Sequence, residues 1–207
     1  MFAQTQNELH NMKHMSILAV SLLALVACTP EKKQEADYSQ YVNPMIGTDF
    51  TGNTYPGAQL PFGMVQLSPD NGLPGWDRIS GYFYPDTTIA GFSHTHLSGT
   101  GAGDLYDISF MPVTRPYKEA PAPLGIYSTF SHNDEAASAG YYRVLLKDYN
   151  INVELTATER CGIQRYTFPE AEASVFLNLK KAMNWDFTLD SKIEVVDSTT
   201  IRGYRLS

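Results

Sequence analysis

The second half of the chain alternates apolar and polar side chains. Between residues 151 and 158, Ile151, Val153, Leu155 and Ala157 are separated by single polar residues. A period of two predicts a strand with one buried face. Similar patterns predict further strands over residues 142–146, 164–168, 174–179, 192–196 and 200–206. Turns recur about every ten residues between these strands, which is typical of an antiparallel meander or sandwich.

Residues 41–125 differ in composition from the second half, because most of the 15 Gly and 12 Pro residues of the chain lie there. Both residue types disfavour long helices. Tyr, Phe, Leu and Ile are interleaved with them, which indicates ordered, loop-rich β structure rather than disorder. The predicted fold class is therefore all-β: an antiparallel β-sandwich with long Gly/Pro-rich loops.

Composition limits the function. A chain of 207 residues can form one domain, or one and a fraction. With 43% hydrophobic and 18% charged residues it has enough apolar side chains for a core. The net charge of −7 argues against nucleic acid as a partner, since binding phosphates requires a positive surface.

The N-terminal region contains an apolar run over residues 15–28, which follows Lys13 and His14. The run is too short for a membrane-spanning helix, which needs about 20 residues, and its basic start and small-residue end are typical of a secretory signal peptide. The sequence Leu-Val-Ala-Cys at 25–28 resembles a bacterial lipobox, which predicts lipidation of Cys28 and a membrane anchor. An ordinary N-terminal helix is the alternative.

These features divide the chain into three parts: a lipoprotein signal peptide with its helix at 1–27, a polar tether at 28–39, and a folded domain at 40–207. Met1, Met12 and Met15 all remain possible starts. Once Cys28 carries lipid, Cys161 is the remaining cysteine, so no internal disulfide is expected.

The densest polar segment is 91–104, which includes His94 and His96. If this segment is extended, both histidines lie on one face and can ligate zinc, with Asp104 or Asp107 as a third ligand. The alternative is that the two histidines pack by hydrogen bonds or contact a sugar. The glycines at 99–103 superficially resemble a phosphate loop, but no Lys follows them, which favours a plain tight turn.

Two other segments carry groups suited to sugars. Residues 53–70 contain Tyr55, Gln59 and Phe62, and residues 74–84 contain Trp76, Asp77 and Arg78. An aromatic ring covers the C–H face of a sugar, while charged neighbours bind its hydroxyl groups. The alternative is that these aromatic residues belong to the core.

Glycosidases need two carboxylates, and several aspartates are available. Sequence spacing pairs none of them; they are Asp70, Asp77, Asp86, Asp104 and Asp107. Residue patterns alone therefore predict a secreted β-domain with a possible polyol-binding face.

Several longer motifs carry a family resemblance. They are Tyr-Val-Asn-Pro-Met-Ile-Gly-Thr at 41–48, the whole of 53–70, Ile-Ala-Gly-Phe-Ser-His-Thr-His-Leu-Ser-Gly-Thr-Gly at 89–101, Asp-Ile-Ser-Phe-Met-Pro at 107–112, Gly-Tyr-Tyr-Arg-Val at 140–144, and residues 153–160 with 165–169. In this order they resemble the N-terminal domain of glycoside hydrolase family 92, the α-mannosidases. The resemblance covers about residues 41–180.

The resemblance implies an N-terminal supersandwich-like β-domain packed on a C-terminal helical catalytic domain. It also implies an exported, calcium-dependent, inverting exo-α-mannosidase that acts on α-mannosides such as N-glycan branches. Many members are lipoproteins of Gram-negative bacteria, so a periplasmic, outer-membrane or cell-surface location is expected. The catalytic acid, the base and the calcium ligands belong mainly to the C-terminal domain, so none is assigned here. The chain ends at Ser207 within a predicted strand, and we expect it to be a fragment.

The resemblance also implies that this domain supplies one wall of the mannose site. The residues that match the motifs are Phe62, Gly63, Trp76, Asp77, His94 and His96. The chain departs from the family pattern at Ile79 and Ala102, where Cys is frequent, at Gln164, where His is frequent, and at Tyr106, where Gly is common. A stand-alone glycan-binding lipoprotein without activity, and a structural sandwich without a ligand, are the alternative functions.

Overall fold

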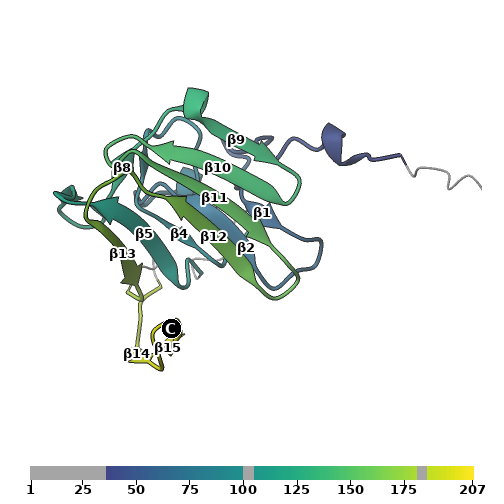
Figure 1. The fold of residues 1–207 in the computed structure, drawn as a ribbon. Helices are drawn as coiled ribbons and strands as arrows, with labels where there is room; N and C mark the ends of the chain where they lie inside the picture. The colour runs from purple at the N-terminus through teal and green to yellow at the C-terminus, as the bar shows by residue number, and fades with distance from the viewer. Residues whose placement is uncertain (1–35, 100–104, 181–185) are drawn as a thin grey trace, which may run out of the picture. The chain divides into compact units, whose positions relative to one another are not determined.

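Two antiparallel sheets form the body of residues 38–207 (Figure 1). The structure is a computed structural model that describes residues 36–99, 105–180 and 186–207. The predicted signal peptide, Cys28 and most of the predicted tether lie outside the described residues. No helix within the described ranges is long and apolar enough to cross a membrane.

The four-stranded sheet has the order β12-β11-β10-β9. Its strands are β9 (Glu135–Ser138), β10 (Tyr141–Leu146), β11 (Ile151–Ala157) and β12 (Gly162–Thr167). In β11, Ile151, Val153, Leu155 and Ala157 are all buried, so the predicted period of two is confirmed. The turn between β10 and β11 passes through Asn150 at φ 51°, a left-handed conformation that Asn tolerates better than most residues.

The five-stranded sheet has the order β1-β2-β4-β5-β13. Its strands are β1 (Ala58–Gln59), β2 (Gln66–Asp70), β4 (Gly91–Ser93), β5 (Ser109–Thr114) and β13 (Ala173–Asn178). The chain leaves the four-stranded sheet after β12, and β13 then pairs with β5. The connection makes a sandwich rather than one continuous meander.

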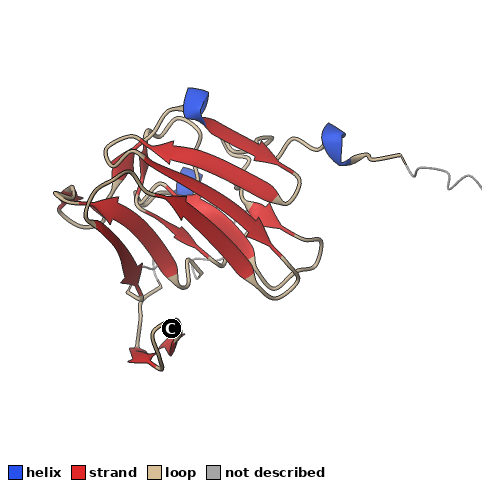
Figure 2. Cartoon of the chain, viewed as in Figure 1, coloured by secondary structure: helices blue, strands red, loops and turns tan. Residues whose placement is uncertain are grey.

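Three two-stranded pairs and three short 3₁₀ turns complete the described structure (Figure 2). The pairs are β3 (Thr88–Ile89) with β8 (Ser128–Thr129), β6 (Glu119–Ala120) with β7 (Gly125–Ile126), and β14 (Asp190–Val195) with β15 (Ile201–Leu206). The turns are η1 (Ser39–Tyr41), η2 (Trp76–Arg78) and η3 (His132–Asp134). The described residues contain no α-helix, and the all-β prediction is confirmed.

The core lies between the sheets and continues beneath the loops. Strand β11 lies against β1 and β2, and one cluster of buried residues joins Tyr142 and Leu155 to Leu67, Phe92 and Val113. Burial of such side chains contributes about 1.5–3 kcal/mol each. With Cys28 outside the described residues and Cys161 exposed and free, this packing is the main support visible for the fold.

The two faces of β2 differ. Leu67 points toward the four-stranded sheet, since a methyl group added at Gly162 of β12 would lie 3.3 Å from its Cδ2. Asp70 is three residues further along and therefore projects from the opposite face. That face is covered by loops rather than by a sheet, and it carries the most extensive polar network of the Gly/Pro-rich half.

Candidate functional site

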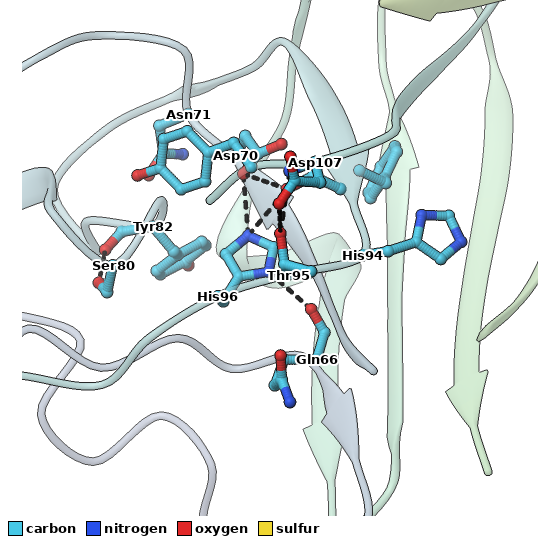
Figure 3. A network of polar contacts seen from close by, with 12 residues as sticks. Gln66, Asp70, Asn71, Ser80, Tyr82, His94, Thr95, His96 and Asp107 are labelled. Carbon is cyan, nitrogen blue, oxygen red and sulfur yellow. Dashed lines mark hydrogen bonds and ion pairs between the residues drawn. The ribbon is translucent and has the colours of Figure 1, made fainter. Parts of the chain in front are cut away.

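A buried histidine and aspartate form the centre of this network (Figure 3). The His96 Nε2 atom lies 2.9 Å from Asp70 Oδ1 and 3.3 Å from Ser93 Oγ. Its Nδ1 atom lies 2.7 Å from the carbonyl oxygen of Gln66. The His96 and Asp70 side chains are 0% and 1% exposed, so His96 is held within the domain and has both ring nitrogens engaged.

Two tyrosine rings flank His96. The ring centroids of Tyr55 and Tyr106 lie 5.1 Å and 5.6 Å from that of His96. Burial raises the pKa of Tyr55 to about 12 and that of Tyr106 well above its usual value, so both hydroxyls keep their protons. Gly81, at φ +92°, makes room for this arrangement, because an added Cβ would lie 2.8 Å from Tyr106 and 2.9 Å from His96.

Tyr106 connects this centre to the surface. Its hydroxyl donates to the Arg78 carbonyl at 2.8 Å, and its ring packs against Ile79. Arg78 ends the η2 turn, on which Trp76 is 55% exposed and Asp77 is also exposed. Two of the predicted sugar-binding residues thus lie together on a turn that the buried Tyr106 contacts.

Arg78 was grouped with Trp76 and Asp77 as a possible sugar ligand, but the structure gives it another role. Its Nε and Nη2 atoms donate to the two carboxylate oxygens of Asp86 at 2.6 and 2.5 Å. Its guanidinium also lies over the Phe83 ring, 4.7 Å from the centroid. A bidentate pair of this kind fixes geometry, so Arg78 anchors the turn and leaves Trp76 and Asp77 as its outward-facing groups.

His94 lies on the other side of the backbone, directed away from Asp70 in Figure 3. Its Nδ1 atom contacts the Ile108 carbonyl at 2.9 Å, and its ring meets Phe110 edge-on and lies beside Gly162. The expectation that His94 and His96 share one face is therefore wrong. The reason is that β4 ends at Ser93, beyond which the period of two no longer applies.

The zinc hypothesis does not fit this arrangement. Within residues 36–99, 105–180 and 186–207, no three His, Cys, Asp or Glu side chains are grouped closely enough to hold a metal ion. Asp104 lies outside the described residues. Asp107 accepts from Thr95 Oγ1 at 2.9 Å and pairs with Arg205.

Phe62 and Gly63 lie on a separate loop between β1 and β2. Phe62 is fully exposed and adopts φ +61°, which is uncommon for a bulky residue. The loop is fastened to the turn between β11 and β12, since Met64 N donates to the Glu159 carbonyl at 2.7 Å. Tyr55, by contrast, is buried and donates to Gln59 Oε1 at 2.5 Å, so these two polar groups satisfy one another.

The predicted residues thus fall into three settings: Trp76 and Asp77 together on η2, Phe62 and Gly63 on the loop at residues 60–64, and His94 and His96 inside the domain on different sides of the backbone. Of the five aspartates, Asp70, Asp86 and Asp107 each pair with a cation or a histidine.

Sequence reasoning missed Arg205. Its side chain is 2% exposed and joins Asp107 to Asp186 at the base of the β14–β15 hairpin. Arg205 lies 98 residues from Asp107 in the sequence, and no local pattern links them. Tyr106 did carry a signal, because the family resemblance led us to expect Gly there, and its φ of +64° is the left-handed conformation that Gly adopts without strain.

Comparisons with known proteins agree with this architecture. The model of the glycosyl hydrolase family 92 N-terminal domain matches residues 41–207. A family GH92 α-mannosidase from Bacteroides thetaiotaomicron, solved in complex with mannoimidazole, is 42% identical with a TM-score of 0.76, over 81% of this chain and 23% of that chain. A family GH92 inverting mannosidase from the same species is 31% identical with a TM-score of 0.58, over 69% of this chain and 20% of that one.

A more distant relative comes from the fungus Arthroderma benhamiae and is described as an uncharacterized secreted glycosidase. It is 27% identical over 172 residues, which is 78% of this chain and 21% of the fungal protein. The chain therefore spans between a fifth and a quarter of the length of these relatives.

Proposed function

This chain belongs to glycosyl hydrolase family 92, whose N-terminal domain matches it, and on that premise we propose that it is the front part of an exported, calcium-dependent, inverting exo-α-mannosidase. The substrates are α-mannosides such as N-glycan branches. The chain supplies one wall of the mannose site, and a C-terminal helical domain supplies the catalytic carboxylates. The support is the family match together with the two mannosidase structures.

The main structural support for the proposal is the arrangement of side chains on the η2 turn. It presents an exposed Trp76 ring beside the exposed Asp77 carboxylate on a support fixed by the Arg78–Asp86 pair. A ring of this kind covers the apolar face of a sugar, and a carboxylate accepts hydrogen bonds from its hydroxyls. Holding the sugar at its non-reacting side contributes to catalysis through positioning.

His96 takes part in the wall without touching the sugar, because it is buried beneath Tyr106 and Tyr55. His94 is likewise half-buried between β5 and β12. Phe62, next to Gly63, presents a second exposed ring. We assign Trp76, Asp77 and Phe62 to direct contact and the two histidines to support.

The chemistry of inversion requires a general acid and a general base set about 6.5–9.5 Å apart, with a water between them. Asp70, Asp86 and Asp107 are engaged in internal pairs, and the family resemblance assigns the catalytic groups elsewhere, so we place both of them in the C-terminal domain. The described residues likewise contain no group of three acidic or His side chains that fits calcium, and the calcium ligands are placed in that domain as well.

Export through a lipidated Cys28 is part of the same proposal, and it would place the enzyme in the periplasm or on the surface of a Gram-negative cell. Its support is the lipobox at 25–28 and the secreted fungal relative. The test is membrane partition after carbonate washing. The wild-type protein should stay with the membrane and a Cys28→Ser variant should not. Retention of the Cys28→Ser variant would contradict the lipid anchor.

The binding role is tested by calorimetric titration of the chain with α-mannobiose. We expect weak binding, with a Kd of about 1 mM, and a loss of at least about tenfold in Trp76→Ala, since stacked aromatic residues dominate such contacts. The matched control is Tyr204→Ala, because Tyr204 is 49% exposed and lies on the β14–β15 hairpin. Absence of heat at millimolar ligand would contradict sugar binding by this domain.

A second measurement tests whether this chain contains the catalytic groups. Hydrolysis of an aryl α-mannoside should require the C-terminal domain, so the chain alone should show no activity above buffer. Turnover by the 207-residue chain alone would overturn the division of labour between the two domains.

A further inference from the structure

Tyr106 touches both the buried His96 centre and the exposed η2 turn. From this geometry we propose that Tyr106 is a positioning residue, which sets the orientation of Trp76 and Asp77 without contacting the glycan. The inference rests on the proposed function, in which Trp76 and Asp77 bind sugar. It adds a residue that acts from below the site.

The η2 turn has little support of its own. None of its three residues is buried, and its backbone bonds are Arg78 N to Gly75 O at 3.1 Å and Ile79 N to Trp76 O at 3.4 Å. The second of these distances is at the long end for a hydrogen bond. A single short turn of this kind opens easily unless tertiary contacts hold it.

Besides the Arg78 guanidinium over the Phe83 ring, two hydrogen-bonded contacts hold the turn. One is the Arg78–Asp86 pair, which fixes the side-chain end of the last residue. The other is the Tyr106 hydroxyl, which donates to the Arg78 carbonyl, the same oxygen that accepts the Gly81 N–H at 2.9 Å. Tyr106 therefore fixes the backbone of the turn at its exit.

Tyr106 is itself firmly held. Its side chain is buried, its ring packs on His96, and its backbone N–H donates to the Thr95 carbonyl at 3.1 Å. His96 in turn is fixed from three sides by Gln66, Asp70 and Ser93. A rigid path thus runs from strand β2 through His96 and Tyr106 to η2.

The backbone around Tyr106 carries strain, with positive φ values at Leu105 (94°), Tyr106 (64°) and Ile108 (55°). Such a conformation is unfavourable for a residue other than Gly. Glycine at position 106 would relieve part of this strain but would remove the ring and the hydroxyl. Tyr106 is therefore a large side chain at an unfavourable backbone position. Its contacts with η2 and His96 offset that cost.

The experiment uses the 207-residue chain with Trp185→Phe, so that Trp76 is its only tryptophan. Hydrogen exchange of the peptide containing Arg78, Ile79 and Gly81, and the fluorescence anisotropy of Trp76, report directly on the turn. Tyr106→Phe removes one hydrogen bond, and we expect exchange of these amides to rise about tenfold. Tyr106→Gly, which also removes the ring, should raise exchange further and lower the anisotropy of Trp76.

Tyr204→Phe is the matched control, since it removes a hydroxyl that donates to Asp190 on the exposed hairpin. It should leave η2 unchanged. Unchanged exchange and anisotropy in both Tyr106 variants, with circular dichroism reporting folded protein, would overturn the proposal.

Titration with α-mannobiose distinguishes failure of this inference from failure of the proposed function. If the wild-type chain binds α-mannobiose, Tyr106→Phe should weaken binding severalfold, and unchanged affinity in a variant with a loosened turn would refute the positioning role. If the wild-type chain releases no heat, the assignment of Trp76 and Asp77 to the sugar fails, and the glycan-positioning inference that depends on it fails too. Loosening of the turn would then identify Tyr106 as a structural support alone.

Discussion

His94 occupies a position that disfavours its charged form. Its ring is half-buried between Phe110 and the backbone of Gly162. Burial lowers the pKa of His94 below its ordinary value, the Ile108 carbonyl opposes that effect in part, and the neighbouring His96 adds to it. The unfolded chain takes up a proton near the ordinary value of about 6.5, whereas the folded chain does so at lower pH. Stability from this group is therefore present above about pH 6.5 and is lost as pH falls through the lowered value.

The corresponding substitution is His94→Gln, which keeps a donor for the Ile108 carbonyl but cannot titrate. Urea unfolding at pH 8, 7, 6 and 5 should show that the free energy of unfolding decreases more steeply toward low pH in the wild-type chain than in the variant. The difference between the two curves isolates His94 from the carboxylates, which both chains share. Parallel curves across this range would contradict the buried neutral form.

At the level of single residues, only part of the candidate site could be predicted from the sequence. The sequence predicted a sugar-binding role for Trp76 and Asp77 from their residue types and neighbours, and the structure places both on one exposed turn. The burial of His96 could not be predicted from the sequence, because its partners Gln66 and Asp70 lie 30 and 26 residues away. Local spacing identifies which side chains can do chemistry, but burial depends on contacts between distant segments.

At the scale of elements, the long strands after residue 140 were predictable, whereas β2, β5 and the shortest strands were not. Strand β11 has seven residues with one buried face, and its alternating pattern follows from that burial. Strands β3, β6, β7 and β8 have two residues each, too few to show a period. Their pairing is fixed by the loops that cover the five-stranded sheet. The switch of β13 to the other sheet also depends on packing rather than on its own sequence.

The β14–β15 hairpin gives the element-scale prediction. A two-stranded hairpin is marginal in water on its own, and Arg205 ties this one to Asp107 and Asp186. The Arg205 side chain is 2% exposed, so Arg205→Gln leaves two carboxylates without their cation. We expect a loss of about 2–4 kcal/mol in the free energy of unfolding, because breaking a buried pair leaves uncompensated charge. Chemical denaturation measures it.

Arg202 is the matched control on the same strand. It pairs with Glu194, but its side chain is 70% exposed, and exposed pairs contribute little. Arg202→Gln should change the free energy of unfolding by no more than about 0.5 kcal/mol. Equal effects of the two substitutions would show that Arg205 does not anchor the hairpin.

For the molecule as a whole, exposed apolar side chains gather in two stretches. One runs through residues 41–64 and includes Phe50, Phe62 and Met64, which are 81%, 107% and 71% exposed. The other is the β14–β15 hairpin, where Val195 pairs with Ile201 across the strands. Exposed apolar surface of this kind marks interaction sites and promotes association. In the proposed enzyme it is the surface available to a second domain.

The hairpin allows this to be tested in the isolated chain. Ile193 and Val195 lie two residues apart and so share one face with Ile201. The wild-type chain should associate with increasing concentration in sedimentation velocity, and Val195→Lys with Ile201→Lys should reduce that association. The two lysines change the net charge from −7 to −5, which by itself weakens repulsion between copies. Reduced association would therefore come from lost apolar surface. Ala139→Lys with Ala171→Lys adds the same charge at exposed positions outside the hairpin and should not reduce association. Equal behaviour of the two double variants would exclude the hairpin as the associating surface.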